Sequence, residues 1–126
     1  MITEAMIEEL VRTFYARVRK DPRLGPIFMN ALGEDWEEHL LLLIDFWSSL
    51  MLTTGRYSGR PLQKHLALQG VKPADFDIWL GLFEGALLDV TTPEIAAAFM
   101  EKAERVARSF KAAMFYNPAD DRPLAR

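Results

Sequence analysis

Apolar residues recur at helical spacing near the start of the chain and predict a first helix over residues 6–20. The buried stripe of this helix is expected to hold Ile7, Leu10, Val11, Phe14 and Val18. Tyr15 follows Phe14 directly, which places its phenol at the edge of that stripe. Two environments stay open for it: a boundary position with the hydroxyl in water, or a polar group in a site.

The pattern then predicts a break and a second long helix. Pro26 is expected to exclude a helix from residues 24–28 and to leave an irregular or single-turn connection that brings Phe28 into the core. Asp35 and Glu38 form a capping-box pattern, which predicts a helix over residues 35–52. His39 either joins the apolar row of this helix or faces solvent with its polar first turn. That row consists of Trp36, His39, Leu43 and Trp47.

The second half of the chain predicts two more helices, over residues 73–90 and 92–115. Thr92 is suited to an N-cap and Pro93 to the first turn. Gly81 and Gly85 share one face of the earlier helix, which is expected to let another helix or a flat cofactor approach the backbone closely. No segment alternates as a strand, so the fold class is all-α. The apolar stripe of the earlier helix comprises Phe76, Trp79, Leu80, Phe83 and Leu87.

A short helix is predicted between Pro61 and Gly70, because proline suits a first turn and glycine the residue after a last one. Leu62, His65 and Leu66 fall on one face of it, so the imidazole lies among leucines. His65 is then either an iron ligand or a partly buried histidine that hydrogen-bonds a backbone carbonyl. The spacing alone leaves both open.

Composition narrows the function classes. The chain has 126 residues, and we expect one domain over residues 1–116 and a flexible tail over 117–126. A formal charge of -3 with well-mixed signs argues against nucleic-acid binding, and the basic run at residues 17–23 is expected to be a solvated helix end. Residues 40–44 form an aliphatic run far shorter than the roughly 20 residues of a membrane span, and acidic residues near the N-terminus break any signal-peptide core. We therefore expect a soluble, cytoplasmic protein.

The chain contains no cysteine, which excludes disulfides, thiolate metal sites and thioether attachment of a haem. Any haem would be held without covalent bonds to the porphyrin, with histidine as the favoured axial ligand.

Several blocks together resemble a known family. The blocks FYARVRKDPRLGPIF, EEHLLLLIDFWSSLML, YSGRPLQKHLAL and FDIWLGLF look like successive segments of the truncated haemoglobins of the third group. The similarity covers nearly the whole chain except the tail. It implies a globin-like two-over-two helical sandwich with a short proximal helix.

The resemblance also implies a site around a non-covalent haem b. His65 would bind the iron on the proximal side, with Tyr15, His39 and Trp79 on the distal side, where a diatomic ligand binds. Tyr57 and Lys64 would meet the haem propionates, with Arg56 and Arg60 as further candidates. The porphyrin would pack against Phe14, Phe28, Leu43, Phe46 and Trp47.

Such a site predicts binding of dioxygen, nitric oxide, carbon monoxide or peroxide, because O–H and N–H donors favour a ligand that draws electron density from ferrous iron. Three donors exceed what reversible oxygen carriage requires, which favours nitric-oxide-consuming or peroxidase-like chemistry over storage. An unidentified reductase would keep the iron ferrous, and the protein is expected to be a monomer or weak homodimer. The alternatives are a cofactor-free helical interaction module and a di-iron bundle, although neither histidine lies in the Glu-x-x-His motif of such bundles.

Overall fold

The part of the chain that the computed structural model describes, residues 1–55 and 70–115, consists of helices and their connections. The predicted all-α class is confirmed, and the long helices lie where the hydrophobic pattern places them. In chain order the elements are α1 (Glu4–Lys20), α2 (Leu24–Leu32), the 3-10 turn η1 (Gly33–Asp35), α3 (Trp36–Leu52), α5 (Asp75–Val90) and α6 (Pro93–Met114).

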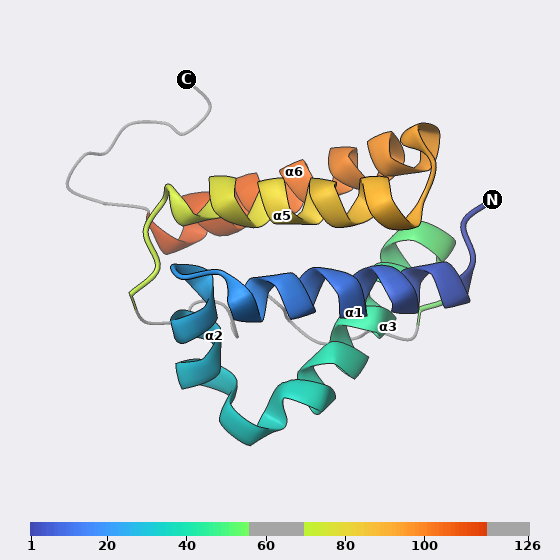
Figure 1. The fold of residues 1–126 in the computed structure, drawn as a ribbon. Coiled ribbons are helices and arrows are strands. Elements are labelled where there is room, and N and C mark those ends of the chain that lie inside the picture. The colour runs from blue at the N-terminus through green and yellow to red at the C-terminus, as the bar shows by residue number, and fades with distance from the viewer. Residues whose placement is uncertain (56–69, 116–126) are drawn as a thin grey trace.

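The helices form two layers, one of α5 with α6 and one of α1 with α2 and α3 (Figure 1). The helices α5 and α6 pack against each other, and α1 packs on both α3 and α5. Thr91 and Thr92 join α5 to α6, so these two helices run antiparallel. This arrangement confirms the expected two-over-two sandwich. The predicted short helix of residues 61–70 falls almost wholly in residues 56–69, outside the described residues.

Aromatic rings fill the centre of the sandwich. Phe14, Phe83 and Phe99 are buried to 1 % exposure or less, and Trp47 is 2 % exposed. Trp47 stacks on Phe83 with ring centroids 5.0 Å apart and 23° between the planes, and lies 5.7 Å from Phe99. These contacts join α3, α5 and α6 through one aromatic cluster. Because such rings bury large apolar areas, they dominate the stability of the core.

The connection from α1 to α2 differs from the prediction. Pro26 does not exclude a helix, because it stands third in α2, within the first turn, where a backbone N–H has no helical partner. The Asp21 carboxylate accepts hydrogen bonds from the backbone N–H groups of Arg23 and Leu24, at 2.9 and 2.7 Å, and so helps to start α2. Gly25 fits tightly, since a Cβ there would lie 2.5 Å from the carbonyl oxygen of Arg19.

The ends of α3 also depart from the expected pattern. The capping box does not form: η1 precedes the helix, and the Asp35 side chain makes no capping hydrogen bond. At the other end Thr53 adopts a left-handed conformation with φ of 56°. A β-branched residue is strained there. Thr92, by contrast, caps α6 as predicted and accepts from the backbone N–H of Ile95 at 3.4 Å.

No helix of the described residues makes the predicted close approach to the backbone at the two α5 glycines, and the predicted approach of a flat cofactor stays a prediction. A Cβ at Gly81 would meet nothing within 4 Å, and one at Gly85 would touch only the Arg17 guanidinium, at 3.4 Å. The glycine that does allow a close backbone approach is Gly25, described above, at the corner between α1 and α2.

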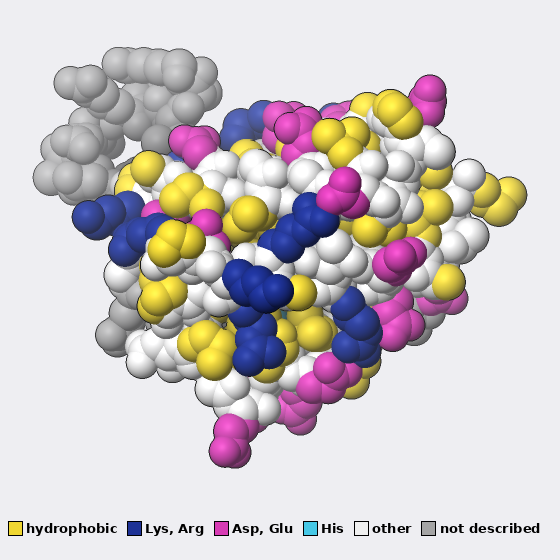
Figure 2. Space-filling view, in the orientation of Figure 1, with side chains coloured by type: hydrophobic (Ala, Val, Ile, Leu, Met, Phe, Trp, Pro, Cys, Tyr) yellow, Lys and Arg dark blue, Asp and Glu magenta, His cyan; other side chains and the backbone are white. Residues whose placement is uncertain are grey.

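Lys, Arg, Asp and Glu side chains are interspersed on the face drawn in Figure 2. The basic residues of the run that was expected to be a solvated helix end are exposed or half-exposed, and three of them also contact other side chains. Arg17 pairs with Asp89, the Arg19 guanidinium lies 4.9 Å from the centroid of the Trp36 ring, and Arg23 pairs with Asp75. Within residues 1–55 and 70–115, no helix is long and apolar enough to cross a membrane.

Candidate functional site

Tyr15 is the centre of the candidate site. Its side chain is 2 % exposed, which excludes the boundary position with the hydroxyl in water. Its ring makes edge contacts with Phe14 at 4.6 Å, Phe28 at 6.0 Å and Trp36 at 5.9 Å between centroids. A phenol is thus held among aromatic rings from α1, α2 and α3.

The side chain of Trp79 on α5 lies close enough to the Tyr15 hydroxyl to lower its pKa by hydrogen bonding. The indole N–H can only donate, so the phenol oxygen accepts this bond and its own proton stays available to another acceptor. Burial raises the pKa of Tyr15 above its ordinary value of 10, and the bond from Trp79 offsets this only in part. Tyr15 therefore stays a protonated donor at neutral pH.

His39 lies beside Tyr15, with ring centroids 5.6 Å apart and 85° between the planes. Its side chain is half-buried and the Nε2 atom is buried, so it belongs to the apolar row of α3 and not to a solvated first turn. The structure thus brings Tyr15, His39 and Trp79 together from three helices. Trp36, whose ring also contacts Tyr15, was not among the predicted site residues.

The other predicted pocket residues divide into two groups. Leu43 and Phe46 are half-buried on α3 and pack against the edge of the core. Phe14 and Trp47 are core residues, and Phe14 contacts Trp79 at 5.5 Å and Phe83 at 5.0 Å. The predicted iron ligand and propionate contacts lie outside the described residues. These are His65, Lys64 and Tyr57, together with Arg56 and Arg60.

An apolar cavity of about 40 Å³ lies beside the aromatic side chains of the candidate site. Phe28 and Trp79 line it from one side, and Phe110 and Met114 of α6 line it from the other. Phe28, which contacts Tyr15, and Trp79 therefore border an apolar hollow between α2, α5 and α6.

These features fit a flat apolar cofactor such as a haem. Polar groups of Tyr15, His39 and Trp79 lie among aromatic side chains, and a site for a porphyrin and a small polar ligand combines these two kinds of group. Two helical layers with such a wall define the class of two-over-two globins.

Comparison with known proteins supports this class. The bacterial-like globin family model matches residues 2–116. The group 3 truncated hemoglobin ctb of Campylobacter jejuni is 41 % identical over 113 residues, which cover 87 % of this chain and 89 % of the relative. The crystal structure of group III truncated hemoglobin from Campylobacter jejuni matches with a TM-score of 0.87 and 39 % identity, over 92 % of this chain and 94 % of that one.

The chain belongs to the bacterial-like globin family, within the group III truncated haemoglobins. Membership implies binding of small diatomic ligands through a haem and its iron.

Proposed function

We propose that the protein binds dioxygen and related small ligands at the iron of a non-covalently held haem b. His65 is the proximal ligand, and Tyr15, His39 and Trp79 lie on the distal side. The observation that carries this proposal is the buried Tyr15 side chain, which is flanked by the His39 ring and lies beside Trp79. The match of the family model to residues 2–116 supports one domain over residues 1–116, with 117–126 as a tail.

A bound haem would supply an open iron position for a diatomic ligand and would shift electron density onto that ligand. Tyr15 would donate its O–H to the ligand atom that gains charge, because Trp79 occupies a lone pair of the phenol oxygen and leaves the proton free. Trp79 therefore acts on the ligand through Tyr15 and orients its hydroxyl. This assignment differs from the sequence-based expectation of three donors that act side by side.

His39 supplies a second polar group at the same place, through a buried Nε2 atom. We propose that it either donates to the ligand or approaches the iron when no ligand is bound. A six-coordinate low-spin spectrum of the ligand-free ferrous protein that is lost in His39→Ala would support the second role. A five-coordinate spectrum of the parent would exclude it.

Reconstitution with haem tests the core of the proposal. The purified protein is expected to develop a Soret band, and His65→Ala should lose the proximal histidine signature in the ferrous state. His39→Ala is the matched control, because it removes the other histidine and should keep that signature. No Soret band, or an unchanged His65→Ala spectrum, would overturn the proposal.

We further propose nitric-oxide-consuming or peroxidase-like chemistry, with a reductase to restore ferrous iron. Its support is the set of polar groups around Tyr15, since such groups stabilise negative charge that develops on oxygen. Stopped-flow mixing of the oxygenated protein with nitric oxide, beside steady-state peroxide turnover, measures both activities. If both are slow, reversible binding of dioxygen is the better description.

We also propose a monomer or weak homodimer and a cytoplasmic location. Sedimentation tests the oligomeric state, and cell fractionation tests the location.

A further inference from the structure

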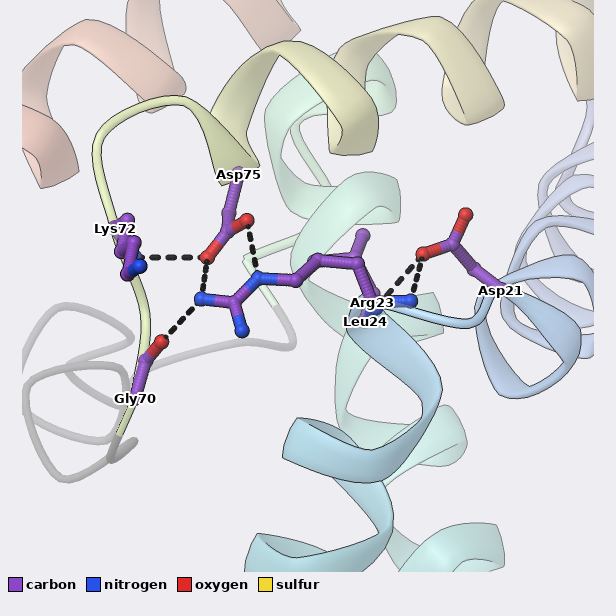
Figure 3. A network of polar contacts seen from close by, with 6 residues as sticks. All are labelled: Asp21, Arg23, Leu24, Gly70, Lys72 and Asp75. Carbon is purple, nitrogen blue, oxygen red and sulfur yellow. Dashed lines mark hydrogen bonds and ion pairs between the residues drawn. The ribbon is translucent and has the colours of Figure 1, made fainter.

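An ion pair between α2 and α5 lies where the chain returns from residues 56–69. Arg23 Nε donates to one carboxylate oxygen of Asp75 at 2.8 Å, and Nη2 donates to the other at 2.9 Å. Nη2 also donates to the carbonyl oxygen of Gly70 at 2.6 Å. Figure 3 shows the Arg23 side chain reaching from the start of α2 to both partners.

The Asp75 carboxylate is the buried half of this pair. Asp75 is 5 % exposed and also accepts from the backbone N–H of Lys72 at 2.8 Å. The hydrogen bonds from Arg23, and less strongly that from Lys72, hold the pKa of Asp75 below its ordinary value in spite of burial. Three donors thus fix one carboxylate, and a buried carboxylate that loses its partner is costly to keep.

The pair joins three segments that border the candidate site. Arg23 precedes α2, which carries Phe28 in contact with Tyr15. Asp75 begins α5, and Trp79 follows one turn later with its bond to Tyr15. Gly70 lies five residues after His65 in the sequence and has φ of 86°, a conformation that favours glycine.

We propose that Arg23 and Asp75 are positioning residues for the haem site, because they hold the Gly70 carbonyl, and so the end of the segment that carries His65, against α2 and α5. This inference rests on the proposed function. Neither residue touches the haem in this role. They fix the position of Gly70 relative to α2, which carries Phe28, and α5, which carries Trp79.

The chain contains a matched control. Arg12 also makes two hydrogen bonds to one carboxylate, at 3.0 and 2.8 Å to Glu37, and its side chain is 39 % exposed, as is that of Arg23. That pair joins α1 to α3, and the Glu37 side chain is 62 % exposed. Arg12→Lys therefore makes the same chemical change at a pair that holds no residue next to the His65 segment.

The test compares Arg23→Lys with Arg12→Lys in the haem-reconstituted protein. Lysine keeps the positive charge, but it lacks the planar guanidinium group that binds the carboxylate and the carbonyl at the same time. Haem transfer to an excess of an apoglobin acceptor should be at least roughly fivefold faster in Arg23→Lys, since a hydrogen bond to a charged group is worth about tenfold or more. Arg12→Lys should stay within about twofold of the parent.

Resonance Raman spectra of the ligand-free ferrous protein separate positioning from stability. The iron–histidine stretching band is expected to shift or broaden in Arg23→Lys and to stay unchanged in Arg12→Lys. Asp75→Asn, which keeps the shape of the side chain, provides a second variant of the same pair. Unchanged haem transfer and an unchanged band in the folded Arg23 and Asp75 variants would overturn the inference, even if their denaturation midpoints fall. A parent protein that takes up no haem, and so develops no Soret band, would instead refute the proposed function.

Discussion

Replacing Tyr15 by phenylalanine is the sharpest test of the distal arrangement. Phenylalanine keeps the ring and therefore the edge contacts with Phe14 and Phe28. Only the hydroxyl is lost, and with it the acceptor of the Trp79 bond. The variant should fold and bind haem like the parent, so that a change in ligand kinetics reports on the hydroxyl.

The expected size of the change follows from the hydrogen bond that disappears. A hydrogen bond to a group that carries charge is worth about 1.5–3 kcal/mol, and each 1.4 kcal/mol is a factor of ten. Dioxygen should therefore leave the ferrous Tyr15→Phe protein about ten- to hundredfold faster. The freed Trp79 N–H can reduce the effect by donating to the ligand itself. The double variant Tyr15→Phe/Trp79→Phe should consequently release dioxygen faster still.

Displacement of bound dioxygen by excess carbon monoxide, followed by stopped-flow absorbance, measures the dissociation rate. Carbon monoxide dissociation is the internal control, because that ligand takes on less negative charge and should respond much less. A Tyr15→Phe protein that releases dioxygen within about twofold of the parent, both alone and with Trp79→Phe, would refute the assignment of Tyr15 as ligand donor. Equal acceleration for both ligands would point to altered access instead.

Three further predictions concern stability. Gly25→Ala should destabilise the fold by about 1–3 kcal/mol, because its Cβ would press on the Arg19 carbonyl, whereas Gly81→Ala, in open space, should stabilise it by up to about 1 kcal/mol; urea unfolding compares the two. Thr53→Gly should relieve left-handed strain and raise the unfolding free energy by up to about 1 kcal/mol in the same assay. The raised pKa of Tyr15 makes its contribution to stability complete below about pH 10 and lost as the pH rises further. Unfolding free energies between pH 9 and 11 should therefore fall more steeply in the parent than in Tyr15→Phe.

The helices could be predicted from the sequence because each carries a periodic apolar stripe. Residues 6–20 and 35–52 were assigned within a few residues, and Thr92 was identified as the cap of α6. Single residues were less informative about where each helix begins. Pro26 can mark either a break or a first helical turn. The hydrogen bonds from the backbone N–H groups of Arg23 and Leu24 to the Asp21 carboxylate start α2 before Pro26, so that Pro26 falls in its first turn. Asp35 matches the capping box, yet the η1 turn before it replaces that cap.

The candidate site was predictable where a resemblance across several blocks pointed to single residues. Tyr15, His39 and Trp79 were named in this way, and the structure places them together. Periodicity alone left Tyr15 at a boundary, since the edge of a stripe can be buried by a partner helix that the pattern does not describe. The Arg23–Asp75 pair spans 52 positions, and no local spacing relates its members. Such a contact follows only from the packing of the layers.

The stacking of Trp79 has a consequence for how the site responds to a ligand. Its ring lies nearly parallel to that of Phe83, at 5.6 Å and 5°, and Phe83 is wholly buried against Trp47. This stacking on a buried ring favours one orientation of the indole and therefore one direction of its N–H. A dipole that is already oriented costs no reorganisation when charge develops near it. In the proposed site, the centre of the sandwich would thereby contribute to ligand affinity without touching the ligand.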